Sequence, residues 1–178
     1  IKEFKTIFNN IFKKKYNLTL IFNIISILYL AFFSLTVWIY LYSFNDAQIV
    51  SIIFLLCIII STDIGGFVVG KLIGGKKLTK ISPNKTYAGM LGSFLFAFLF
   101  TYLFYNFQKS FFDFKINIFV LIFIISIFSQ IGDLIFSYLK RKAKMKDTGS
   151  ILPGHGGILD RIDGILLALP IGIILIST

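Results

Sequence analysis

The chain has 178 residues, of which 57% are hydrophobic and only 15% are charged, and 22 residues are phenylalanine. Long apolar runs with so few charges are typical of helices that cross a lipid bilayer, so the composition argues against a soluble globular domain. The single cysteine, Cys57, excludes a disulfide framework. The formal net charge of +10 does not require a nucleic-acid partner, because basic residues of membrane proteins gather on the cytoplasmic side.

The first expected element is a short amphipathic helix within residues 1–17. Apolar residues recur there with helical spacing, from Ile1 and Phe4 to Ile11 and Phe12, and lysines occupy the other face. This pattern fits a helix that lies in the membrane interface, and the tail of an upstream element is the alternative. Because the sequence begins with isoleucine rather than methionine, we expect further helices upstream of a single membrane-embedded domain over residues 1–178.

Five apolar runs follow, each long enough, or nearly so, to cross a hydrocarbon core of roughly 30 Å. They are Leu20–Tyr42, Gln48–Gly70, Gly89–Phe107, Ile116–Leu139 and Gly164–Ser177, the last being the shortest. Basic residues alternate between the intervening segments: residues 1–15 hold five, 71–87 hold five and 138–163 hold six. The sequence therefore predicts an all-α, polytopic membrane protein with about five transmembrane helices, its N-terminus and two polar loops on the cytoplasmic side.

Two carboxylates fall inside predicted spans, Asp63 and Asp133. An ionisable group in a bilayer is costly and is usually functional, so each needs a partner or water. Asp133 belongs to a polar stripe spaced by three or four residues along one helix face. The stripe consists of Ser126, Ser129, Gln130, Asp133, Ser137, Lys140 and Arg141. We interpret it as the wall of a water-accessible cavity; a hydrogen-bonded seam between helices is the alternative, which accounts for the serines but less well for a carboxylate.

The segment after the second span, residues 71–90, combines three glycines with five lysines and a Ser-Pro-Asn-Lys-Thr cluster. Lysine and backbone N–H groups are natural partners of phosphate, so Ser82, Lys85 and Thr86 are candidate substrate contacts. A positively charged loop that only sets topology would explain the lysines without this cluster.

The loop before the last run is the most polar part of the chain. Its candidate residues are Ser137, Lys140, Arg141, Lys146, Asp147, His155, Gly156, Gly157, Asp160, Arg161 and Asp163. Carboxylates among cations beside a glycine-rich turn are typical of a site for a magnesium–polyphosphate complex. Zinc is a poor alternative, because the only histidine and the only cysteine are far apart in the chain.

The spacing of these residues, together with Asp63, Gly70-Lys71 and the Ser82–Thr86 cluster, resembles the two sequence blocks of the phosphatidate cytidylyltransferase, or CDP-diacylglycerol synthase, family. The resemblance covers residues from about 55 to 178 and departs from the family pattern at Phe67 and Ala88. It implies conversion of CTP and phosphatidic acid to CDP-diacylglycerol and pyrophosphate with Mg²⁺, a homodimer, and a metal centre at the cytoplasmic side of the membrane. A second, monovalent ion is a further expectation.

The resemblance also implies roles for individual residues. The metal-binding acids of the family fall on Asp133 and Asp160, and Asp163 and Asp63 are additional candidates. The catalytic set would be Asp133, Asp160, Lys140 and Arg141. The substrate-binding set would be Ser82, Lys85, Thr86, Ser137, Lys146, Asp147, His155, Gly156, Gly157 and Arg161. Since a phosphatidate oxygen is already an anion, no strong general base is required, and His155 is not expected to be one.

Two other functions fit parts of the pattern. A CTP-dependent polyprenol or phytol kinase would use the same nucleotide but transfer phosphate. A membrane transporter would require polar groups through the whole depth of the bilayer, whereas the first span and the outer halves of the second and fourth are nearly all apolar. The expected location is the cytoplasmic membrane of a bacterium, with the active site facing the cytoplasm.

Overall fold

The computed structural model describes residues 1–13, 15–42, 45–79, 81–112, 114–149 and 156–177. Its helices are α1 (Lys2–Ile11), α2 (Tyr16–Leu41), α3 (Asp46–Ile73), α4 (Tyr87–Phe107), the short 3₁₀ turn η1 (Lys109–Phe111), α5 (Ile118–Lys142) and α6 (Leu159–Ser177). The described residues contain no named strand, and an isolated bridge pairs Lys77 with Thr86. The predicted all-α class is confirmed.

Within the part of the chain that the structure describes, four helices are long and apolar enough to cross a membrane: α2, α3, α4 and α5. They match the first four predicted runs, with boundaries that differ by no more than four residues. Each helix begins before its apolar run or ends after it, because flanking polar residues continue or cap the helix. Asn45, for example, caps α3, its side chain accepting a hydrogen bond from the Ala47 N–H. The chain is an integral membrane protein by this criterion.

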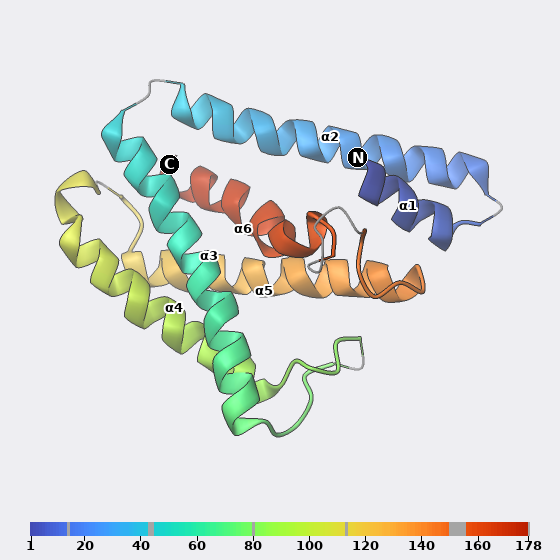
Figure 1. The fold of residues 1–178 in the computed structure, drawn as a ribbon. Helices are drawn as coiled ribbons and strands as arrows, with labels where there is room; N and C mark the ends of the chain where they lie inside the picture. The colour runs from blue at the N-terminus through green and yellow to red at the C-terminus, as the bar shows by residue number, and fades with distance from the viewer. Residues whose placement is uncertain (14, 43–44, 80, 113, 150–155, 178) are drawn as a thin grey trace.

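The fifth run lies within α6 but is not among those four helices. Three charged residues occupy the first turns of α6 (Asp160, Arg161 and Asp163), and Pro170 lies in its interior. The helix is packed between α2 and α5 (Figure 1) and buries one side through residues such as Leu166 and Ile173. In this structure α6 is therefore chiefly a core helix, whose charged start faces the polar end of the bundle.

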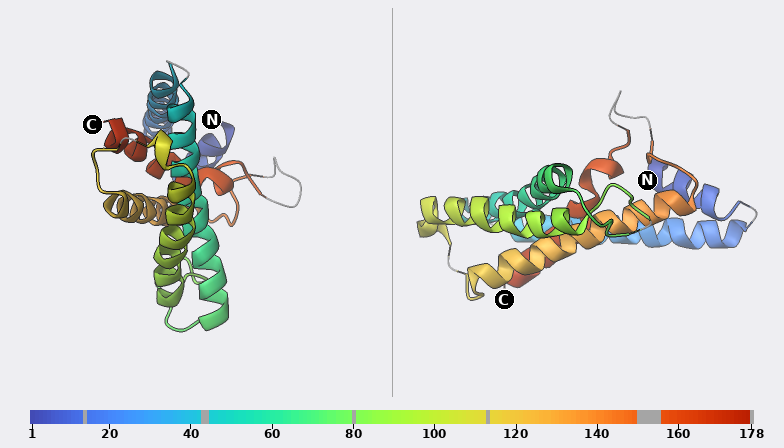
Figure 2. Two further views of the ribbon diagram at one scale, coloured as in Figure 1. Left: turned by 90° about the vertical axis from the view of Figure 1, so that its left-hand side faces the viewer. Right: turned by 90° about the horizontal axis from the view of Figure 1, so that it is seen from below.

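The helices form two closely packed pairs, α3 with α4 and α5 with α6, as both Figure 1 and Figure 2 show. The main apolar core lies where these pairs meet, around Phe54, Ile58, Ile122 and Ile125. The loop after α3 and the end of α5 also meet: the Nε of Arg141 donates to the carbonyl oxygen of Ile81 at 3.4 Å. The fold thus brings the two basic loops together.

Helix α1 is present where an amphipathic helix was predicted, but its apolar face is covered by protein. Phe4, Ile7 and Phe8 are buried in a second cluster with Phe136 of α5 and with the start of α6. The lysines of α1 stay exposed on the opposite face. Contact of this lysine face with the membrane surface stays a prediction.

The close approach of α3 and α4 depends on glycine, and substituting Gly65 tests this. An added Cβ at Gly65 would lie 2.5 Å from the carbonyl oxygen of Gly92 and 2.6 Å from the Cβ of Phe96. Since neither atom is the end of a flexible side chain, we expect Gly65→Ala to cost about 1–3 kcal/mol and to lower the thermal unfolding midpoint in detergent. Gly70→Ala on the same helix is the matched control, because its nearest atoms are 3.3–3.4 Å away; equal shifts in both variants would contradict this packing.

Candidate functional site

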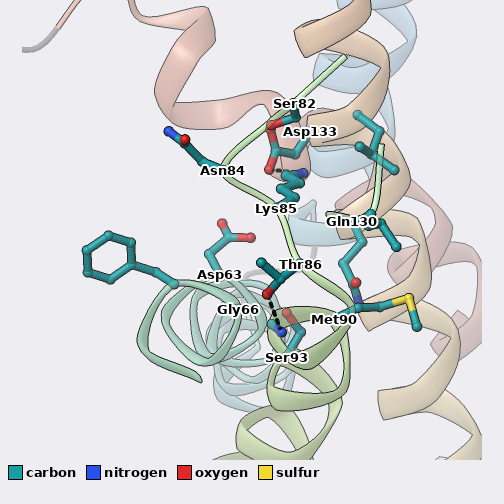
Figure 3. A pocket seen from close by; sticks show the side chains of 14 residues that line it. Asp63, Gly66, Ser82, Asn84, Lys85, Thr86, Met90, Ser93, Gln130 and Asp133 are labelled. Carbon is teal, nitrogen blue, oxygen red and sulfur yellow. Dashed lines mark hydrogen bonds and ion pairs between the residues drawn. The ribbon is translucent and has the colours of Figure 1, made fainter. Parts of the chain in front are cut away.

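A cavity of about 290 Å³ opens between α3, α4, α5 and the loop after α3 (Figure 3). It is lined by Asp63, Gly66, Phe67, Leu78, Ser82, Asn84, Lys85, Thr86, Gly89, Met90, Ser93, Gln130, Asp133 and Leu134. Three predicted substrate contacts and both intramembrane carboxylates are in this set. Asp63 and Asp133, which belong to different helices, therefore line the same cavity.

The loop after α3 is shaped by its own backbone hydrogen bonds. The Leu78 N–H donates to the Lys85 carbonyl at 2.7 Å, and the Lys85 N–H donates to the Ser82 carbonyl at 3.1 Å. Thr86 then caps α4 by accepting from the Gly89 N–H at 3.0 Å. These contacts bring residues 77–78 back against residues 85–86, and the Lys85 side chain points into the cavity (Figure 3).

Lys85 forms an ion pair with the Oδ2 of Asp133 across the cavity. The second carboxylate oxygen of Asp133 accepts a hydrogen bond of 3.3 Å from the Ser137 hydroxyl, one turn further along α5. Both partners of the ion pair stay partly accessible, at 25% for Lys85 and 31% for Asp133. An incoming anion or cation can therefore reach either charge from the cavity.

Asp133 is one of three neighbouring acids on three different helices. Asp63 of α3 lines the same cavity, and the charges of Asp63 and Asp163 both interact with that of Asp133. The α5 and α6 backbones nearly touch here, since a Cβ on Gly132 would lie 2.7 Å from the carbonyl oxygen of Asp163. Like charges this close disfavour one another unless cations join them.

A second ion pair lies at the cytoplasmic end predicted for α5 and α6. The Nζ of Lys140 is 2.7 Å from the Oδ1 of Asp160, and their side chains are only 14% and 10% exposed. The Oδ2 of Asp160 accepts from the Thr148 N–H at 2.8 Å and the Gly157 N–H at 3.0 Å. Burial alone would raise the pKa of Asp160, but Lys140 and these two N–H groups outweigh it and hold that pKa below its usual value.

The polar stripe on α5 serves two purposes at different depths. Ser126 accepts a hydrogen bond of 3.0 Å from the Thr62 hydroxyl in a fully buried contact between α5 and α3. Further along the stripe, Gln130 and Asp133 line the cavity, and Lys140 forms the second ion pair. The hydrogen-bonded seam is therefore the right interpretation for Ser126, which contacts α3. The cavity wall is the right interpretation for Asp133.

Comparison with known protein families identifies the family of this chain. Residues 4–178 match the model of the family described as "Cytidylyltransferase family". The chain belongs to the cytidylyltransferase family. The predicted resemblance is thereby confirmed.

Similar members of the cytidylyltransferase family come from several bacteria, and each of the following is named phosphatidate cytidylyltransferase. The Rickettsia bellii protein is 40% identical over 121 residues, covering 65% of this chain and 52% of its own length. The Helicobacter pylori protein is 41% identical over 132 residues (69% and 46%), and the Bacillus subtilis protein 43% identical over 120 residues (66% and 44%). The chain spans about half the length of the curated relatives it matches.

The remaining predicted residues of this member of the family differ in how they are placed. Arg141, Lys146, Asp147 and Arg161 are exposed near the second ion pair, so they are accessible to a soluble nucleotide. His155 lies outside the described residues. The assignment of these residues to substrate stays a prediction.

Gly156 and Gly157 have a structural reason to be glycine. Gly156 has a φ of +82°, which side chains disfavour. A Cβ on Gly157 would lie 2.1 Å from the Oγ1 of Thr148. These glycines let the chain pass close to Thr148 and Asp160. Their predicted contact with substrate stays a prediction.

Sequence reasoning missed several residues of the site, among them three polar ones. Asn84 lines the cavity, and its position in the Ser-Pro-Asn-Lys-Thr cluster was the available signal. Thr148 is 1% exposed and bonds Asp160. Glu3, buried in α1, also reaches Thr148, and no pattern in the sequence indicates this contact.

The acids of the site suit a hard divalent cation only in part. Among the described residues, no group of three or more His, Cys, Asp or Glu side chains forms a metal site from protein ligands alone. Mg²⁺ usually takes one or two carboxylates and completes its shell with phosphates and water, so the Asp133 neighbourhood fits it. Asp160 fits less readily, because Lys140, Thr148 and Gly157 already occupy both its oxygens.

Proposed function

We propose that this chain is the cytidylyltransferase core of an enzyme of phospholipid biosynthesis that converts CTP and phosphatidic acid to CDP-diacylglycerol and pyrophosphate. One observation carries the proposal: a cavity containing the Lys85–Asp133 pair opens among apolar helices, close to the Lys140–Asp160 pair. A lipid phosphate and a water-soluble triphosphate need this combination of an apolar wall and a charged mouth. The names of the bacterial relatives support the same reaction.

In the proposed reaction, a phosphatidate oxygen attacks the α-phosphorus of CTP in line. A new phosphorus–oxygen bond forms, the bond from the α-phosphorus to the bridging oxygen of the β-phosphate breaks, and pyrophosphate leaves. The barrier is lowered mainly by holding the two phosphates together and by offsetting their charge. No proton has to be removed from the nucleophile.

The cavity provides a place for the lipid phosphate. Lys85 supplies the cation, with Ser82 and Asn84 beside it as hydrogen-bonding groups. Phe67, Leu78, Met90 and Leu134 form an apolar wall for the attached lipid. A phosphate bound here would replace Asp133 as the partner of Lys85. The Asp133 carboxylate would then be free to bind another cation.

The second group of cations provides a place for the triphosphate. Lys140, Arg141, Lys146 and Arg161 lie on or near the end of α5 and the start of α6, and three of them are exposed. Arginine and lysine at such a site stabilise charge on the transferring and leaving phosphates.

Mg²⁺ is the proposed cofactor. Asp133 would hold it, together with Asp163 or Asp63 from the facing helices. The bound ion would offset phosphate charge in the transition state. Asp160 would become a metal ligand only by losing one of its present partners, Lys140, Thr148 or Gly157. We therefore propose that its first role is to hold these groups in place. A second, monovalent ion would offset further charge among the clustered acids.

We further propose a homodimer in the bacterial cytoplasmic membrane, with the site facing the cytoplasm. The concentration of lysine and arginine in alternate segments supports this orientation. The bacterial relatives support the location.

An assay with labelled CTP, phosphatidic acid and Mg²⁺ in membranes containing the protein tests the function. We expect a lipid product that carries cytidine, with release of pyrophosphate and no product when Mg²⁺ is chelated. Polyprenol and phytol are offered in parallel reactions. A phosphorylated alcohol without cytidylylated lipid would instead favour the kinase, and ion flux without either product would favour a transporter.

A further inference from the structure

Glu3 is a buried carboxylate whose partners lie about 150 residues further along the chain. Its side chain belongs to α1 and is 6% exposed. Its Oε1 accepts from the Ile158 N–H at 2.8 Å, and its Oε2 accepts from the Leu159 N–H at 2.8 Å. Its Oε2 also lies 2.9 Å from the Thr148 Oγ1. Since Glu3 is the only glutamate in the chain, no other glutamate can replace it.

These contacts make Glu3 the cap of α6. The first N–H groups of a helix have no partner within the helix, and they lie at the positive end of its dipole. Ile158 and Leu159 supply such N–H groups, and a carboxylate from another helix satisfies them. Helix starts beside glycine-rich turns often bind phosphate, but here the protein's own carboxylate takes that position. The N–H groups of Ile158 and Leu159 are therefore already occupied and do not face a substrate phosphate.

Thr148 connects Glu3 to the second ion pair. Its hydroxyl oxygen is 2.9 Å from Glu3 and 3.0 Å from the Oδ2 of Asp160. The hydroxyl has one hydrogen and donates to one carboxylate at a time, while the Thr148 N–H is fixed on Asp160 at 2.8 Å. A side chain on Gly157 would clash with Thr148 and Glu3, so glycine is needed here. Glu3, Thr148 and Asp160 thus form one continuous polar cluster.

The rest of α1 keeps this cluster dry. Phe4, Ile7 and Phe8 pack with Phe136 and Leu159 around the cluster. In a low-dielectric surrounding, hydrogen bonds to a carboxylate are strong and their loss is costly. Glu3 is therefore held in place by burial, by two backbone N–H donors and by the Thr148 hydroxyl that it shares with Asp160.

We propose that Glu3 is a positioning residue, through which α1 holds Thr148 and residues 157–160 in the arrangement that pairs Asp160 with Lys140. The effect on catalysis rests on the proposed function, but the structural effect does not. Without Glu3, the segment would be correctly arranged for only a fraction of the time. Apparent affinity falls in proportion to that fraction, whereas turnover at saturating nucleotide changes less.

The test compares Glu3→Gln with the wild-type protein in lipid nanodiscs. Hydrogen–deuterium exchange should accelerate by about tenfold or more at the amides of Ile158 and Leu159, because a hydrogen bond to a charged group is lost. The KM for CTP should rise by a similar factor with a smaller change in kcat. Glu3→Asp, which keeps the charge on a shorter side chain, should show an intermediate exchange rate. Asp46→Asn removes an exposed acid from the start of α3 and should leave both measurements unchanged.

Unchanged exchange at the start of α6 in Glu3→Gln would overturn the proposal. Equal acceleration at all amides of α5 and α6 would also overturn it, because Glu3 would then support the bundle as a whole. If wild-type protein makes no cytidylylated lipid, the proposed function fails while the exchange result still decides the role of Glu3.

Discussion

Asp133→Asn is expected to reduce the formation of CDP-diacylglycerol by at least about 10²–10³-fold, the range seen when one electrostatic contact to a reacting group is removed. Asp133 pairs with Lys85, accepts from Ser137 and interacts with the charges of two further acids. Asparagine keeps the shape but removes the charge that holds both lysine and a divalent ion. Initial rates in proteoliposomes, normalised to inserted protein, measure the effect.

A second variant separates the two tasks of Asp133. If its main task is to pair with Lys85, Asp133→Asn should bind Mn²⁺ as well as the wild-type protein does. If it holds Mg²⁺, the binding of Mn²⁺, measured by electron paramagnetic resonance, should weaken in Asp133→Asn but not in Lys85→Met, which removes the other partner of the ion pair. We expect the second result. Near-normal activity in Asp133→Asn would remove Asp133 from the metal site.

The helices of this protein are largely predictable because a bilayer demands long apolar runs. Four predicted spans appear as α2 to α5. The sequence predicted less about α1 and α6, because these two helices are surrounded by other parts of the protein. The charged start of α6 lies at a polar junction, and the apolar face of α1 packs on α5 and α6. Periodicity reveals that a face is apolar but does not distinguish lipid from protein as its neighbour.

The site is predictable where spacing along one helix determines it. The stripe on α5 places Asp133, Ser137 and Lys140 on one face without any structure. The contacts between segments are different, because they depend on loop conformation. Lys85 reaches Asp133 through a loop folded by its own backbone bonds, and Glu3 reaches α6 across the whole chain. No local pattern contains this information.

The Lys140–Asp160 pair should show the second large effect. Both side chains are mostly buried, so removing one partner leaves an unpaired charge, which costs about 3–5 kcal/mol in buried pairs. We expect Lys140→Met and Asp160→Asn each to lower kcat/KM by about a hundredfold or more. The two losses should not add, because each change breaks the same interaction.

The double variant Lys140→Met with Asp160→Asn therefore decides what Asp160 does. If Asp160 mainly anchors the loop through Lys140, the double variant should be no worse than the weaker single variant, and Mn²⁺ binding should persist in Asp160→Asn. If Asp160 is a metal ligand, Mn²⁺ binding should fall in Asp160→Asn but not in Lys140→Met. The bonds from Thr148 and Gly157 to Asp160 lead us to expect the anchoring result. If the losses of kcat/KM in the two single variants add in full in the double variant, the interaction between Lys140 and Asp160 does not contribute to catalysis.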